Sequence, residues 1–260
     1  MKKPVTLYIL LLALSIGVLF LLNLFLGSVD IPFRSIWNIL WGMDEGESVI
    51  WQNIIWKSRV PQALTAMVAG AGLAVSGLQM QTVFRNPLAG PSVLGISSGA
   101  SLGVAFVVLL SGSIGGIALS RLGFMGEIAL TIAAIIGALS IMALIVYVSQ
   151  KVHGNVTLLI IGVMIGYVAN AVIGVLKFFS VEEDIRAYVI WGLGSFARVS
   201  GNQMMVFVCI MAVLLPLSFL LIKTLNLLLL GDAYARNLGL NIKRARLEVI
   251  ACSGVLVAIV

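Results

Sequence analysis

Six long apolar runs divide this chain, and each is long enough to cross a lipid bilayer as an α-helix. A bilayer core of roughly 30 Å takes about 20 helical residues. Lipid offers no partner to backbone N–H and C=O groups, so a spanning segment satisfies them within a helix or a closed barrel. The alternating apolar and polar residues of barrel strands are missing, and 61% of the residues are hydrophobic. We therefore predict an all-α, polytopic membrane protein.

The predicted spans share an apolar core with more polar residues at the ends. They cover residues 6–26, 60–84, 92–111, 127–149, 156–176 and 203–225. A seventh run, residues 247–260, is too short for a crossing and carries neither a polar flank nor a helix stop signal. We therefore expect six complete spans and a truncated seventh, within a single transmembrane domain over residues 1–260 of a longer protein.

The distribution of basic residues predicts the orientation in the membrane. When the N-terminus is cytoplasmic, the inner segments hold more Lys and Arg than the outer ones, as the insertion rule requires. The first run follows Lys2 and Lys3, but it is too long for the apolar part of a secretory signal and no small-residue cleavage site follows. It is therefore expected to be retained. The net charge of +6 suits anionic lipid at the inner face, and no nucleic-acid partner is expected.

Catalytic and metal-binding patterns are missing from the sequence. Cys209 and Cys252 lie in apolar runs without a CxxC or CxxH neighbour and are interpreted as small buried hydrophobic residues. His153, the single histidine, lies in a short polar turn, where a solvated side chain is far more common than a ligand. No Ser-His-Asp set, carboxylate pair or phosphate-binding loop is present. We therefore expect no catalytic residue, no metal site and no cofactor in this chain.

Glycine recurs at four-residue spacing in two predicted spans. The third span contains Gly95, Gly99 and Gly103. The fifth span contains Gly162, Gly166, Asn170 and Gly174. Small residues at this spacing let helices approach closely in lipid, where association depends on packing. Asn170 also places an amide near mid-membrane, which is costly unless it faces a neighbour or a wet pathway. Tight packing and a translocation pathway are both open for the second stripe.

Two connecting segments have recognisable helix-terminating or helix-starting signals. Prolines in residues 85–91 stop the second span and form a rigid inner turn, after which Ser92 is expected near the N-cap of the next helix. On the outer side, Ser180 and Glu183 have the spacing of a capping box. A short surface helix is therefore expected there.

A polar segment, residues 231–246, separates two apolar runs at the predicted inner face. Asp232 is expected to cap a short helix, Gly239 to end it in the left-handed conformation, and Asn241 to cap the next span. A compact amphipathic helix at a membrane face is suited to binding a protein partner. A polar connector with snorkelling basic side chains is the alternative.

Several short motifs occur in a fixed order along nearly the whole chain. They are Arg59-Val-Pro-Gln62, residues 69–77, Gln81, Asn86-Pro-Leu-Ala89, residues 94–100 and residues 231–240. Together they resemble the permease family (FecCD-type) of the binding-protein-dependent ABC importers for iron-siderophore complexes, haem and cobalamin. The resemblance implies about ten spans in the full-length subunit. It also implies a second permease copy or paralogue, cytoplasmic ABC ATPases that bind ATP and Mg²⁺, and a periplasmic or lipid-anchored binding protein.

The resemblance also assigns roles to residues of this chain. Segment 231–246 would couple to the ATPase, through Gly231, Asp232, Ala233, Tyr234, Ala235, Arg236, Leu238 and Gly239. Arg59 would dock the binding protein, Gln62 stands where the family has a second arginine, and Lys57 is a candidate replacement for that charge. The fifth span would line the translocation pathway with Gly162, Gly166, Asn170 and Gly174.

The predicted function is therefore the permease subunit of an ATP-driven importer, multi-pass in the bacterial inner membrane, and not an enzyme itself. Small side chains along the path suit a bulky metal chelate better than a bare ion, which needs ligating oxygens. The lack of a His, Cys or Tyr constellation favours a ferric siderophore over haem and leaves cobalamin open. A secondary transporter driven by an ion gradient is the alternative, although its coupling acids would lie within spans. A purely structural membrane subunit would leave segment 231–246 unexplained.

Overall fold

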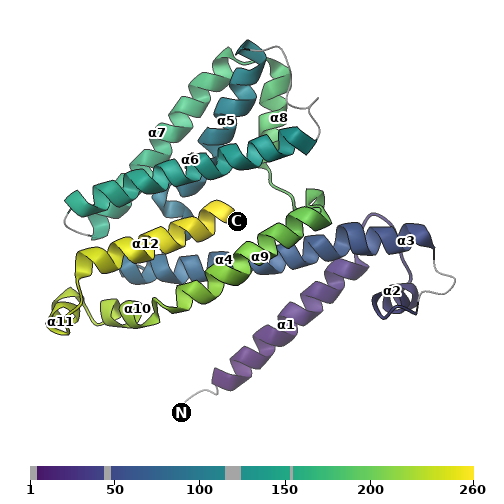
Figure 1. The fold of residues 1–260 in the computed structure, drawn as a ribbon, viewed down its shortest axis with the longest axis horizontal. Helices are drawn as coiled ribbons and strands as arrows, with labels where there is room; N and C mark the ends of the chain where they lie inside the picture. The colour runs from purple at the N-terminus through teal and green to yellow at the C-terminus, as the bar shows by residue number, and fades with distance from the viewer. Residues whose placement is uncertain (1–4, 44–47, 115–123, 153–154) are drawn as a thin grey trace. The chain divides into compact units, whose positions relative to one another are not determined.

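The computed structural model describes residues 5–43, 48–114, 124–152 and 155–260, and every regular element in these ranges is a helix (Figure 1). The all-α prediction is therefore confirmed, while His153 lies outside the described residues. The principal helices are α1 (Val5–Phe25), α2 (Phe33–Leu40), α3 (Val49–Ile54), α4 (Val60–Phe84), α5 (Ile96–Ile114), α6 (Phe124–Lys151), α7 (Asn155–Phe179), α8 (Glu182–Gly192), α9 (Gly201–Phe219), α10 (Ile222–Leu229), α11 (Asp232–Asn237) and α12 (Ile242–Ile259).

Five described helices are long and apolar enough to cross a membrane. They are Val5–Phe25, Val49–Phe84, Gly126–Lys151, Val156–Phe179 and Gly201–Phe219, and Ile96–Leu110 forms a shorter apolar helix. The second of these joins α3 to α4 through a π-helical turn, η1 (Ile55–Arg59). The chain divides into two compact units, residues 1–71 with 195–212, and residues 72–194 with 213–260.

The predicted sixth span, residues 203–225, is wrong at its C-terminal end. α9 contains Pro216, which has no N–H to donate to the Ala212 carbonyl one turn earlier. The helix ends at Phe219, and a tight turn follows in which Leu220 N donates to Leu217 O and Leu221 N to Ser218 O, both at 3.1 Å. A separate helix, α10, therefore leads into segment 231–246.

Two predicted helix starts are also corrected. Residues Pro91–Leu94 form a 3₁₀ turn, η2, and Gly95 adopts a left-handed φ of +72°, so α5 begins after the glycine rather than at Ser92. The Ser180 hydroxyl donates to the carbonyls of Leu109 and Leu176, at 3.0 and 2.6 Å, so it does not form the predicted capping box of α8.

The close packing predicted from glycine spacing is confirmed between α5 and α6. Gly99 and Gly103 of α5 lie against Gly137 of α6, and a Cβ at any of the three would press on backbone atoms of the facing helix. Gly103 is packed against the Ala133 carbonyl, and Gly137 against the Gly99 carbonyl. The helix backbones are therefore in direct contact, as small residues allow in lipid.

Replacing Gly103 by alanine is expected to destabilise the protein by about 1–3 kcal/mol, because the added methyl group overpacks the contact between α5 and α6. Thermal unfolding in detergent, followed by circular dichroism, measures the change. Gly17→Ala in α1 is the matched control, since a Cβ there meets nothing within 4 Å. Equal melting temperatures for the two variants would contradict the packing argument.

In the second unit, one core cluster fixes the helix ends around segment 231–246. Its buried members include Phe84 of α4, Ala235 of α11, and Ile242, Ala245 and Val249 of α12. Away from these ends, α4 and α12 share a polar seam: the Ser76 and Ser253 hydroxyl oxygens lie 2.6 Å apart, and Gln79 Nε2 donates to Cys252 Sγ at 3.6 Å. The two helices are therefore joined both by apolar packing and by hydrogen bonds.

Candidate functional site

Segment 231–246 folds as a short helix, a tight turn and the first turn of α12. Gly231, with φ of +108°, is the N-cap of α11, and Asp232 follows in the first turn without a side-chain cap hydrogen bond, so the predicted cap at Asp232 is wrong. Gly239 ends the segment's helix with φ of +85°, as predicted. Asn241 is confirmed as a cap, because its Oδ1 accepts from the Arg244 N–H at 3.2 Å.

The Asp232 carboxylate bridges two arginines from distant parts of the chain. Its Oδ1 accepts from Arg85 Nη2 at 2.5 Å, and its Oδ2 accepts from Arg246 Nη2 at 2.5 Å. Arg85 ends α4 in a left-handed conformation, with φ of +48°, and Arg246 lies on α12. We call this set of three side chains the Asp232 clamp. It ties α11 to the end of α4 and to the beginning of α12.

The α11 helix has one packed side and one free side. Ala235 is fully buried in the core cluster, whereas the side chains of Tyr234 and Leu238 are 69% and 63% exposed. Arg236, also exposed, lies two positions from each of them along the chain. The helix is therefore packed on one side through Ala235 and exposes two large side chains.

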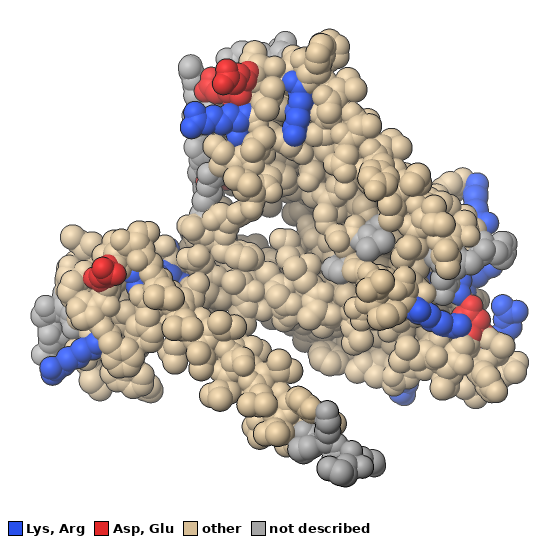
Figure 2. Space-filling model, turned by 180° about the vertical axis from the view of Figure 1, so that it is seen from behind, with Lys and Arg blue, Asp and Glu red and all other residues tan. Residues whose placement is uncertain are grey.

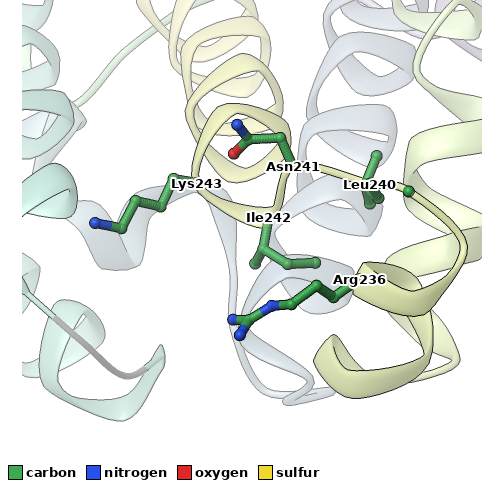
Figure 3. A pocket seen from close by; sticks show the side chains of 6 residues that line it. Arg236, Leu240, Asn241, Ile242 and Lys243 are labelled. Atoms are coloured by element: carbon green, nitrogen blue, oxygen red, sulfur yellow. The ribbon is translucent and has the colours of Figure 1, made fainter.

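A shallow pocket of about 380 Å³ lies next to this surface. It is lined by Arg236, Gly239, Leu240, Asn241, Ile242 and Lys243. Figure 3 shows Arg236 extending from α11 and Lys243 from the first turn of α12, so basic groups come from two helices. An acidic group of a partner would find charge complementarity there.

On the face shown in Figure 2, the charged side chains form separate clusters and most of the remaining surface is uncharged. This distribution is expected of helices that meet lipid along their length and water at their ends. Segment 231–246 belongs to one of these polar ends, because Arg236, Lys243, Arg244 and Arg246 all lie within it.

Arg59 occupies a different environment from the one predicted for a docking residue. Its side chain is 5% exposed, and its guanidinium donates to the carbonyls of Leu24, at 2.6 Å, of Phe25, at 3.2 Å, and of Val29. A cation at these free carbonyls stabilises the C-terminus of α1. Lys57 is exposed and Gln62 is partly buried, so in this segment the surface charge belongs to Lys57.

Arg59→Ala is expected to lower the stability of the detergent-solubilised protein by about 2 kcal/mol or more, since it leaves carbonyls at the end of α1 without their charged donor. Lys57→Ala, which changes an exposed side chain, should leave the melting temperature unchanged. A docking role without a structural one predicts the reverse for Arg59: an unchanged melting temperature and weaker association with the binding protein.

The predicted pathway stripe on α7 divides into two parts. Gly162 and Gly166 are buried, and Gly95 before α5 lies against both of them. This half of the stripe is a helix contact within the chain and does not line an open path. Asn170 and Gly174 are exposed, and a Cβ at Gly174 would meet nothing within 4 Å. Only this second half is free to face a pathway.

Residues 12–260 match the model of the FecCD transport family. The chain is 35% identical over 233 residues to the hemin transport system permease protein HmuU of Yersinia pestis, covering 89% of this chain and 66% of the relative. It is 35% identical over 253 residues to the vitamin B12 import system permease protein BtuC of Serratia proteamaculans, covering 97% of this chain and 69% of the relative. The chain thus spans about two thirds of the length of these relatives.

One solved structure has a similar fold, with a TM-score of 0.77 and 28% sequence identity over 99% of this chain and 75% of its own length. It is described as an inward-facing conformation of a metal-chelate type ABC transporter. The match extends the similarity from sequence to fold, and it includes the segment that carries the Asp232 clamp.

Proposed function

Because this chain belongs to the FecCD transport family, we propose that it is the permease subunit of an ATP-driven, binding-protein-dependent importer of a metal chelate. Relatives at 35% identity are permeases of hemin and vitamin B12 import systems, which are transport components rather than enzymes. ATP and Mg²⁺ would be bound by a separate ATPase, and this chain would supply the path through the inner membrane.

The main support for this proposal is α11, which is packed against the core on one side and exposed on the other. Exposed Tyr234 and Leu238 would form a surface for a groove of the ATPase, in the way that amphipathic helices bind grooves. Ala235 and the Asp232 clamp hold the opposite side of the helix to the rest of the unit. A displacement of α11 would therefore also act on the helices to which α11 is held.

We propose that the Asp232 clamp transmits this displacement. Closure of the ATPase pair would move α11, and the carboxylate would carry the movement to Arg85 at the end of α4 and to Arg246 on α12. The Ser76–Ser253 hydrogen bond and the shared core favour movement of α4 and α12 together. Such rigid-body movement of packed helices is a common basis of alternating access.

The cargo is proposed to be a metal chelate rather than a bare ion. No group of three or more His, Cys, Asp or Glu side chains in the described part of the chain could hold a metal ion. Asn170 and Gly174 on α7 offer a polar amide and an open surface, which suit contact with a bulky ligand. A ferric siderophore, haem and cobalamin all remain candidates, and a second permease copy would complete the path.

The binding protein is proposed to dock near Lys57, which is the exposed cation of the segment that the family resemblance assigns to docking. Gln62 stands at the place of the family's second arginine and supplies no charge. Arg59 would act mainly through the position of α1, since its guanidinium is already bound to backbone carbonyls. The surface offered to the partner is then less basic than the family pattern implies.

Uptake by proteoliposomes tests the proposed cargo. The intact permease is reconstituted with its ATPase and supplied with binding protein loaded with ferric siderophore, haem or cobalamin. Uptake of one cargo that stops when either ATP or binding protein is left out would establish the substrate. Equal exclusion of all three chelates, in vesicles that hydrolyse ATP, would overturn the chelate assignment.

A further inference from the structure

The helix that follows the first span has two apolar sides, of which one is packed. α2 buries Ile36 and Ile39 in a core cluster with Ile31 and Ile55. Phe33 and Trp37 on α2, and Trp41 at its C-cap, remain 62%, 47% and 64% exposed. These three positions are four residues apart, so they share one side of the helix. An exposed set of large rings on one side calls for an apolar or interfacial environment.

The exposed rings continue the surface of the preceding span. Phe25, in the last turn of α1, stacks on Phe33 with ring centroids 4.8 Å apart. Phe33 stacks in turn with Trp37 at 6.3 Å, and Trp37 lies 5.8 Å from Trp41. We call these four side chains the aromatic row. It forms a continuous line of ring contacts from α1 along α2.

The end of α1 fixes the level of the aromatic row relative to that span. α1 is a candidate membrane span, and none of the apolar stretch that qualifies it is buried inside the protein. The Arg59 guanidinium donates hydrogen bonds to the carbonyls of Leu24 and Phe25, so a charged group lies at the C-terminal end of α1. Because Phe33 touches the last turn of α1, α2 lies at the level where the span ends.

We propose that the aromatic row lies in the lipid–water boundary at this end of α1 and anchors α2 to the phospholipid surface. Aromatic side chains concentrate at this depth, where a ring meets acyl chains and a Trp N–H can meet water or a headgroup. Arg34 is exposed on the same helix and has the length to reach a phosphate group. The ligand is thus the phospholipid interface, and the proposal does not depend on what the protein transports.

Quenching of tryptophan fluorescence by brominated phosphatidylcholine tests the position of the row. Variants of the intact permease that keep Trp37 or Trp41 as the only tryptophan, with Phe at the others, are placed in vesicles. Their emission should fall more with bromine near the carbonyl end of the acyl chain than with bromine near its methyl end, and aqueous iodide should quench it weakly. Trp51, which packs against the core cluster of α2, is the matched control and should respond less.

Emission from Trp37 and Trp41 that no brominated lipid quenches would overturn the proposal. Strong quenching by iodide would then mean that water covers the row, and weak quenching by iodide would mean that protein covers it. A phosphatidylcholine with a diazirine near its carbonyl end provides a second measurement on the unsubstituted protein. Adducts are expected on the peptide that contains residues 33–41, and labelling confined to peptides of α1 would contradict the anchor.

Discussion

Asp232→Asn is expected to reduce ATP-driven uptake by roughly tenfold or more, a size typical of a lost coupling between sites. Asparagine keeps the shape of the side chain but removes the charge that Arg85 and Arg246 share. The two guanidinium groups would then repel each other across the joint between α4, α11 and α12. ATP hydrolysis should continue, so the ratio of cargo imported to ATP hydrolysed should fall.

The number of cargo molecules imported per ATP hydrolysed is the measurement that separates this effect from simple instability. Glu248→Gln is the matched control, because it breaks the Arg244–Glu248 pair on α12, which is an exposed pair four residues apart. Such surface pairs contribute little to stability. Partial recovery of the ratio in Asp232→Arg combined with Arg85→Asp would support the clamp directly. An Asp232→Asn variant that behaves like Glu248→Gln would rule the clamp out as the joint.

Tyr234→Asp and Leu238→Asp are each expected to weaken association with the ATPase by roughly 30-fold or more, the cost of losing a central interface residue. Both side chains are apolar and more than half exposed, while the backbone beneath them is held by Ala235. A carboxylate at either position would lose its hydration in the partner's groove. Copurification of the two subunits, followed by a binding titration, measures the loss.

Leu193→Asp is the control for these two substitutions, because Leu193 is 79% exposed just beyond α8 and far from segment 231–246 in the sequence. It should leave ATPase association unchanged. Retained association in both the Tyr234 and the Leu238 variants would show that the ATPase binds elsewhere. Loss in all three variants would show that added charge, rather than position, disrupts the complex.

Most of the helical architecture follows from the hydropathy of the sequence, because the bilayer requires long apolar helices whatever their packing. The span at 60–84 agrees with α4, and α1, α6 and α7 differ from their predicted ranges by a few residues. The exceptions are the end of α9 and the start of α5. α9 ends at Phe219, three residues after Pro216, and Gly95, in a left-handed conformation, delays the start of α5.

Two helix ends in segment 231–246 were predictable from the sequence, but the contacts of the segment with other helices were not. Asn241 caps one helix and Gly239 ends another through the local backbone, so the residue types at these two positions are enough to predict both roles. The Asp232 clamp joins Asp232 to Arg85, 147 positions away, and no local spacing indicates such a pair. The sequence places the charged residue Arg85 beside the Asn-Pro turn, but this position does not identify the residue with which Arg85 pairs.

The burial of Arg59 differs from what its place in the sequence predicts. A basic residue at the start of an apolar span usually lies in the interfacial region. Here the Arg59 guanidinium donates hydrogen bonds to the carbonyls at the end of α1, so it is not available to solvent or to a partner. The stripe on α7 shows a similar difference. Gly162, Gly166, Asn170 and Gly174 recur every four residues, but Gly95 packs against only Gly162 and Gly166.

Uptake driven by ATP, compared with uptake driven by an ion gradient, distinguishes an ATP-driven importer from a secondary transporter. Vesicles that contain the permease, its ATPase and loaded binding protein are given ATP alone, or an imposed proton or sodium gradient alone. We expect uptake with ATP, none with a gradient, and a loss of ATP-driven uptake in the Leu238→Asp variant. Uptake that follows the ion gradient in vesicles without the ATPase would contradict it and identify a secondary transporter.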